Sequence, residues 1–136
     1  MLENRTIEVW AYNLEAVLAE KLETVISRNV TNTRMRDFYD IYILQKLHGE
    51  QLKKQVLWNA LVATARKRGT LEQINSGDRR EIFDEIEISS VMENLWKAYQ
   101  KNYYYAANIS WQMVMQSIRF LYEISYNDNE RTIIHE

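Results

Sequence analysis

Residues 14–28 read LEAVLAEKLETVISR, and residues 31–48 read TNTRMRDFYDIYILQKLH. In the first stretch apolar residues recur at spacings of three and four, which predicts an amphipathic helix. The second stretch opens with a Thr-Asn-Thr sequence that can cap a helix running to about residue 48. Because the connection is short, we expect the two helices to form an antiparallel αα-hairpin. The expected core-facing residues of the first helix are Leu14, Val17, Leu18, Leu22 and Val25, with Glu15, Glu20 and Glu23 on its remaining surface.

A lysine interrupts this apolar face. At about 100° per residue, Lys21 falls inside the arc of apolar positions, and Arg28 lies on the same line. Burying an unpaired cation costs several kcal/mol, so Lys21 must meet an acid or a polar cavity. Asp37 and Asp40, three residues apart on one face of the second helix, would lie opposite.

These charges have two interpretations. They form either an ion-pair network that fixes the hairpin or a polar site for an anionic ligand such as a nucleotide. The residues of that site would be Lys21, Arg28, Arg34, Arg36, Asp37 and Asp40.

The rest of the chain is also expected to be mainly α. It has no proline and only three glycines, so helices can run almost uninterrupted. Residues 5–10 alternate polar and apolar side chains, which suits one short β-strand. We therefore expect a bundle of about five to six helices built on the hairpin, as a single domain over 1–126 with a loose tail over 127–136. The further helices are expected at about 50–68, 70–88 (one or two), 91–102 after a capping box at Ser90–Glu93, and 109–125 after a cap at Asn108.

Composition excludes several classes of protein. A chain of 136 residues with 46% hydrophobic and 26% charged residues is neither disordered nor fibrous. It has no run of eighteen apolar residues and no signal-peptide pattern at its N-terminus, which argues against a membrane protein. The absence of cysteine and the presence of only two histidines exclude disulfides and histidine-rich metal sites. A reducing cytoplasm is the expected compartment.

Charge is unevenly distributed along the chain. Residues 51–69 carry five basic side chains and no acidic one, whereas residues 70–95 carry seven acidic side chains and two arginines. Either two elements of opposite charge face each other, or residues 51–69 form a phosphate-binding stripe.

Two apolar features lie towards the end of the chain. The region from Trp96 to Trp111 is rich in aromatic residues at partly helical spacing, which favours core packing over stacking of RNA bases. The last helix has apolar stripes on opposite sides, so we expect a partner surface and self-association. One stripe comprises Ile109, Met113, Phe120 and Ile124, and the other Trp111, Met115, Ile118 and Tyr122.

Two segments resemble a known family. Leu18-Ala19-Glu20-Lys21-Leu22-Glu23 followed by Arg28, and then Asn32-Thr33-Arg34-Met35-Arg36-Asp37-Phe38-Tyr39-Asp40, look like the paired motifs of the AbiEii/AbiGii nucleotidyltransferase toxins. Arg36 stands where that family usually has lysine, which keeps the charge but alters the hydrogen-bond geometry. Ala65-Arg66-Lys67-Arg68-Gly69-Thr70 is similar to a weaker arginine-glycine-threonine feature of these proteins.

The resemblance implies a nucleotidyltransferase that moves a nucleoside monophosphate from a nucleoside triphosphate within an abortive phage-infection system. In such enzymes an upstream half supplies a glycine-serine turn and an Asp-x-Asp pair that holds magnesium. This sequence contains neither motif, and Glu85-Ile86-Glu87, its nearest acidic pair, reads as ordinary solvated surface. The chain therefore resembles the C-terminal half of such a toxin, and we expect it to be inactive alone.

The resemblance also implies roles and partners. In a completed enzyme Lys21 would contact the triphosphate, Asp37 would orient or deprotonate the attacking group, and Asp40 would hold Lys21 or Arg28. Magnesium and a nucleoside triphosphate would bind only with an N-terminal half, and no cofactor is expected in this chain alone. The expected partners are that half or further copies of the chain, with RNA as a possible acceptor. The alternative is a non-catalytic helical interaction module that binds a partner protein or RNA.

Overall fold

The fold is described from a computed structural model. It describes residues 13–75 and 79–134, with residues 79 and 127–134 described by their backbone alone. The β-strand expected at residues 5–10 lies outside these ranges.

The described residues are mainly α-helical, as predicted. The N-terminal hairpin consists of α2 (Leu14–Arg28), a 3₁₀ turn η1 (Asn29–Thr31) and α3 (Met35–His48). A second turn, η2 (Gly49–Gln51), leads into α4 (Lys54–Arg68), which is followed by the short α5 (Leu71–Asn75) and by α6 (Arg79–Ile88). The last elements are α7 (Ser90–Asn102), the turn η3 (Tyr104–Ala106) and α8 (Trp111–Ile134).

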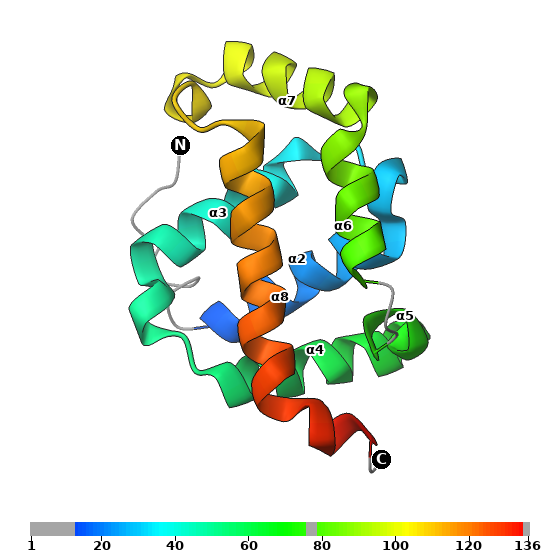
Figure 1. Cartoon of the computed structure of the whole chain (residues 1–136). Helices are drawn as coiled ribbons and strands as arrows, with labels where there is room; N and C mark the ends of the chain where they lie inside the picture. The colour runs from blue at the N-terminus through cyan, green and yellow to red at the C-terminus, as the bar shows by residue number, and fades with distance from the viewer. Residues whose placement is uncertain (1–12, 76–78, 135–136) are drawn as a thin grey trace.

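The long helix α8 lies across the other helices (Figure 1). It packs against α3, α4 and α6, while α4 also packs along α2. α7 crosses one end of the bundle and contacts α6, η3 and α3. The apolar face of α2 is buried as predicted, and it joins one continuous core with α3, α4, α7 and α8 that includes Phe38, Trp58, Trp96 and Ile118.

Hydrogen-bonding caps lie one or two residues from their predicted positions. α7 is capped by Ser89, whose Oγ accepts a hydrogen bond from the Met92 amide, and not by the predicted Ser90 box. α8 starts after Ser110, whose Oγ accepts from the Met113 amide, and not after Asn108. Asn32 accepts from the Arg34 amide through Oδ1 and so forms a turn ahead of α3, which begins at Met35. Neighbouring Ser and Asn residues compete for the same role, and local pattern does not separate them.

α8 differs from its prediction in length and in its two faces. It continues to Ile134 through the segment expected to be a loose tail, since no glycine or proline interrupts residues 111–134. Trp111 and Ile118 are buried in the chain's own core, so that stripe needs no partner. The opposite stripe keeps two exposed side chains, Met113 and Phe120.

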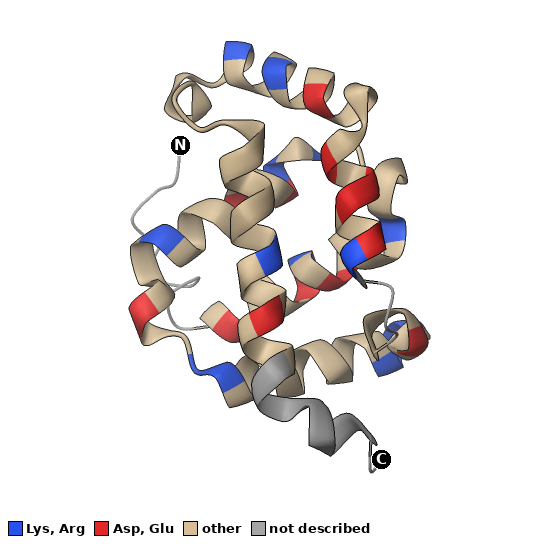
Figure 2. Cartoon of the chain, viewed as in Figure 1, with Lys and Arg blue, Asp and Glu red and all other residues tan. Residues whose placement is uncertain are grey.

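The basic segment is not a continuous stripe. Its charges sit before and at the two ends of α4, because residues 55–65 carry none (Figure 2). With a rise of 1.5 Å per residue, the backbone positions of Lys54 and Arg66 are about 18 Å apart along the helix axis. Among the described residues, the ion pairs of the acidic helix α6 are made with a different helix. Asp84 and Glu87 of α6 bind Arg119 of α8 at 2.8 and 2.9 Å, and not the basic residues of α4.

Within the described ranges, no helix combines the length and apolar character that a membrane crossing requires.

Candidate functional site

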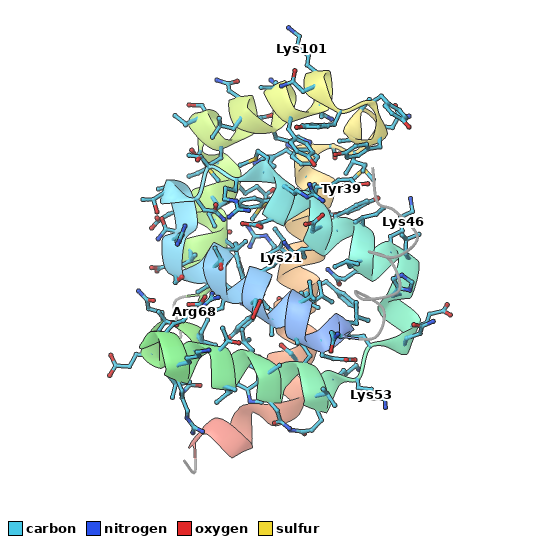
Figure 3. The ribbon with its side chains drawn as sticks, turned by 180° about the vertical axis from the view of Figure 1, so that it is seen from behind. Lys21, Tyr39, Lys46, Lys53, Arg68 and Lys101 are labelled. Carbon is cyan, nitrogen blue, oxygen red and sulfur yellow. The ribbon has the colours of Figure 1, made fainter. Side chains whose placement is uncertain are left out.

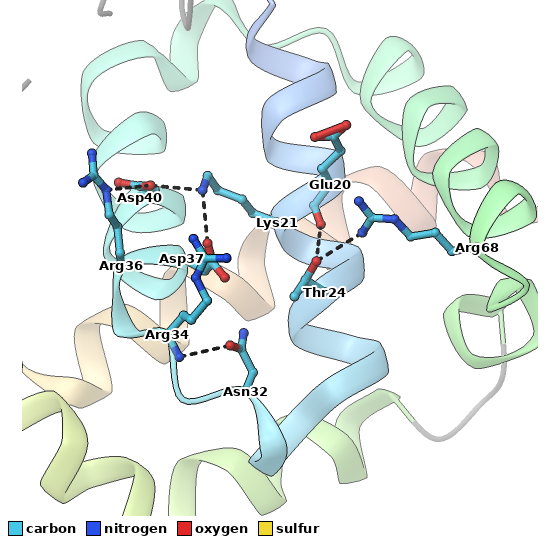
Figure 4. A network of polar contacts seen from close by, with 9 residues as sticks. All are labelled: Glu20, Lys21, Thr24, Asn32, Arg34, Arg36, Asp37, Asp40 and Arg68. Carbon is cyan, nitrogen blue, oxygen red and sulfur yellow. Dashed lines mark hydrogen bonds and ion pairs between the residues drawn. The ribbon is translucent and has the colours of Figure 1, made fainter.

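Lys21 is the centre of a polar cluster between the two helices of the hairpin (Figures 3 and 4). Its ammonium Nζ donates a hydrogen bond to Asp37 Oδ1 at 3.2 Å and lies 3.1 Å from Asp40 Oδ2. This confirms the predicted pairing of a cation of the first helix with acids of the second. Because α2 is otherwise apolar on this face, the two aspartates provide the compensation that a lysine there requires.

Asp40 is the more enclosed of the two acids, with a side chain that is 2% exposed. Its second cation is Arg36, one turn earlier on α3, whose Nε lies 3.8 Å from Asp40 Oδ2. Burial raises the pKa of Asp40 above its ordinary value, although Lys21, and more weakly Arg36, favour the charged form. The charge of Asp40 therefore depends on its cations staying in place.

A hollow of about 440 Å³ opens beside Lys21. That volume lies within the roughly 300–1,000 Å³ of small-molecule sites. Four of the six predicted site residues line it, and so do residues of α2 and the end of α4. Its lining residues are Glu20, Lys21, Glu23, Thr24, Ser27, Arg28, Arg34, Asp37, Arg68 and Thr70.

Arg68 and Thr70 also line this site, although neither was among the predicted site residues. Arg68 Nη1 donates to Glu23 Oε1 at 2.5 Å and to Thr24 Oγ1 at 3.2 Å, while Thr70 Oγ1 donates to Glu23 Oε2 at 2.8 Å. Glu23, expected on the surface, is buried by these contacts. Gly69, which lies between Arg68 and Thr70 in the chain, adopts a left-handed conformation with φ of 75°. This conformation ends α4 and lets both neighbours reach Glu23.

The signal for these two residues was present in the sequence. Arg68-Gly69-Thr70 is the arginine-glycine-threonine feature described in the sequence. A glycine at this position is typical of a helix end, where the chain turns and the residues on either side of the glycine can face the same neighbour. What the sequence did not reveal is the acid that they contact, because Glu23 lies 45 residues before Arg68.

The remaining predicted residues divide between two places. Arg28 and Arg34 line the hollow, and the Arg34 backbone is fixed by Asn32 at 3.1 Å. Among the described residues Arg28 makes no ion pair with Asp37 or Asp40, so of the two expected cations it is Lys21 that binds these acids. Arg36 and Asp40 line a different hollow with three tyrosines of α3 and η3.

Comparison with protein families matches residues 1–117 to the model described as "Nucleotidyl transferase AbiEii toxin, Type IV TA system". The chain belongs to the AbiEii toxin family. The family resemblance inferred from the sequence motifs is therefore confirmed. Neither the curated proteins nor the solved structures contain a match to the chain.

In this AbiEii protein the three motif segments come together in space. The α2 motif supplies Lys21, and the α3 motif supplies Asp37 and Asp40. The end of α4 supplies Arg68, and the turn after it supplies Thr70. The described residues contain no group of three or more His, Cys, Asp or Glu side chains arranged to hold a metal ion. Asp37 and Asp40 instead converge on the Lys21 ammonium, so these two acids do not by themselves fit magnesium.

Proposed function

We propose that this AbiEii domain forms the nucleotide-contacting helical half of a nucleotidyltransferase, in which Lys21 binds the triphosphate and Asp37 acts on the attacking group. The observation that carries the proposal is the position of Lys21 Nζ between Asp37 and Asp40 at the wall of the polar hollow. An ammonium has three donors. Two are directed at the aspartates, which leaves one for a phosphate oxygen.

The charge of the hollow supports an anionic ligand. Lys21, Arg28, Arg34 and Arg68 provide four positive charges, against three carboxylates from Glu20, Glu23 and Asp37. One of those carboxylates, Glu23, is buried and already bound by Arg68 and Thr70. Setting the Glu23–Arg68 pair aside leaves three cations against two carboxylates, the same excess of one positive charge, which suits a phosphate group.

Asp37 has the geometry of a group that positions or accepts a proton. Its Oδ1 is held by Lys21, and no described residue donates a hydrogen bond to Oδ2. The free oxygen can accept a proton from an attacking hydroxyl. Asp40 is buried beside it and acts by holding Lys21, so its role is positioning.

Metal-dependent steps are not assigned to these residues. Phosphoryl-transfer enzymes of this kind use carboxylates to hold magnesium against the triphosphate. The sequence contains no Asp-x-Asp pair and no Gly-Ser turn. In the proposal, an N-terminal half that carries both motifs supplies them, and RNA is the acceptor to be tested first.

The test is incorporation of each labelled nucleoside triphosphate, measured for the chain alone and for the chain mixed with an AbiEii N-terminal half. We expect no incorporation by the chain alone and transfer by the mixture. Lys21→Ala and Asp37→Ala should abolish transfer, and Asp40→Asn should weaken it partly. Lys101→Ala is the matched control, because Lys101 is exposed on α7 and points away from the hairpin (Figure 3).

A folding control accompanies these variants. Removing the partner of two buried acids costs at most about 3–5 kcal/mol, and less here because the Lys21 side chain is 20% exposed. Circular dichroism should therefore show a folded Lys21→Ala chain. Robust incorporation by the chain alone, or full activity of a folded Lys21→Ala mixture, would disprove the proposed roles.

A further inference from the structure

A second, smaller hollow lies next to the Lys21–Asp40 ion pair. Its volume is about 240 Å³. α3 contributes Arg36, Asp40 and Leu47 to its walls, and η3 contributes Tyr104 and Tyr105. Asp40 lines this hollow and Lys21 lines the polar one. The two hollows are therefore separated by the Lys21–Asp40 ion pair.

One wall of this hollow is a fixed aromatic surface. The rings of Tyr39 and Tyr105 have centroids 4.9 Å apart. Tyr105 is held from behind by Tyr99, through hydroxyl groups 3.2 Å apart, and Tyr99 is stacked on the buried Trp96. Such a braced set of rings loses little conformational entropy when a flat ligand packs against it.

Tyr104 is exposed to an unusual degree for an aromatic residue. The residue is 82% exposed although it lines the hollow, and its ring meets that of Tyr105 edge to face with centroids 5.9 Å apart. On α3 the hollow also borders Leu47, which is 55% exposed. These side chains contribute little to the core, so their apolar surface is available to a ligand.

The accessible charged group of this otherwise apolar hollow is Arg36. Its side chain is 59% exposed and can donate hydrogen bonds or stack its planar guanidinium, whereas the Asp40 carboxylate beside it is 2% exposed and holds the two cations. A flat ring with acceptors on its edge matches this combination. Nucleobases have that chemistry, and they stack on aromatic side chains.

We propose that this hollow binds a single nucleobase, which stacks on Tyr104 and presents its edge to Arg36. The inference rests on the proposed function, since it places the base next to the phosphate-binding Lys21. The base belongs either to the nucleoside triphosphate or to the end of an acceptor RNA strand. Both sources have the same recognition chemistry, and titration separates them.

The test compares the 136-residue chain with Tyr104→Ala and Tyr104→Trp by calorimetric titration. The ligands are the four nucleoside triphosphates, a short single-stranded RNA and inorganic tripolyphosphate, which has no base. Tyr104→Ala should weaken at least one base-containing ligand about tenfold, the size of one lost stacking contact. Tyr104→Trp should retain binding, and tripolyphosphate should be unaffected by either change. Phe120→Ala, which removes an exposed aromatic side chain from a different groove, is the control and should change nothing.

The outcomes distinguish this inference from the proposed function. An effect on the triphosphates alone assigns the base to the nucleotide, and an effect on the RNA alone assigns it to the acceptor. If Tyr104→Ala weakens a base-containing ligand while Lys21→Ala leaves tripolyphosphate binding unchanged, the base site stands and the phosphate role of Lys21 fails. The inference is overturned if no base-containing ligand binds at millimolar concentration, if Tyr104→Ala leaves all of them unchanged, or if it weakens tripolyphosphate equally.

Discussion

Glu23 of α2 and Arg68 of α4 form an ion pair whose two ends differ sharply in exposure. The Glu23 side chain is 2% exposed, whereas that of Arg68 is 44% exposed and faces the polar hollow. Since Thr70 occupies the second oxygen of Glu23, this carboxylate ties the end of α4 to the middle of α2. Arg68 is thus oriented towards the hollow by a buried acid.

Glu23→Ala should therefore destabilise the protein. It removes the acceptor of two hydrogen bonds and leaves a small cavity, and we expect the free energy of unfolding to fall by about 2–3 kcal/mol. Urea denaturation measures this. The matched control is Glu20→Ala, one turn earlier and exposed, which should change stability by no more than about 0.5 kcal/mol. Equal effects of the two changes would contradict the role given to Glu23.

The two described glycines should respond oppositely to substitution. Gly69 has φ of 75°, so Gly69→Ala should cost about 1–2 kcal/mol even though no atom lies within 4 Å of the added Cβ. Gly49 has φ of −56° in equally open space, so Gly49→Ala should be neutral or stabilise by about 0.4–1 kcal/mol. Thermal unfolding of both variants checks this contrast, and a stabilised Gly69→Ala protein would be inconsistent with the left-handed turn.

Asp40 should titrate above its ordinary pKa of 3.8, because its burial outweighs the attraction of Lys21. A carboxyl whose pKa is raised by folding binds its proton more tightly in the folded state. Its contribution to stability is then present below pH 3.8 and is lost as the pH rises through the folded-state pKa. Carbon-13 NMR titration of the Asp40 carboxyl measures the shift directly, and Asp40→Asn should remove this component of the pH dependence. A pKa at or below 3.8 would show that Lys21 dominates.

Self-association, predicted from the last helix, stays a prediction, and only one of the two apolar stripes of α8 can be used to test it. Trp111 and Ile118 belong to the core, and Ile118→Ala should cost about 2–4 kcal/mol. Phe120 is 58% exposed in a groove between α3 and α8, so Phe120→Glu should leave the unfolding temperature unchanged. If copies of the chain pair through this groove, light scattering should show a smaller species for Phe120→Glu than for the unchanged chain. The same mass for both would exclude this groove as the contact.

The hairpin and its central ion pair were predictable because their determinants are local. Apolar periodicity defines α2, and Lys21 on an apolar face demands an acid that only the neighbouring helix can supply at short range. The burial of Glu23 was not predicted, because its cause is not local. On the helix it falls on the polar side, and only the packing of α4 against α2 buries it. The aromatic hollow was also beyond prediction, since it depends on η3 folding back onto α3.

The separations between partners along the chain have a consequence for how the protein is assembled during synthesis. The contacts of Lys21 with Asp37 and Asp40 span 16 and 19 residues, so they can form as soon as the hairpin has left the ribosome. The hydrogen bonds that attach α8 are of another kind: Gln45 donates to the Ser117 carbonyl 72 residues away, and Tyr122 donates to the Ile74 carbonyl 48 residues away. The charged centre of the site thus belongs to an early-forming unit. The helix that covers the core docks late, so we expect a nascent chain to hold Lys21 against Asp37 and Asp40 well before the domain is closed.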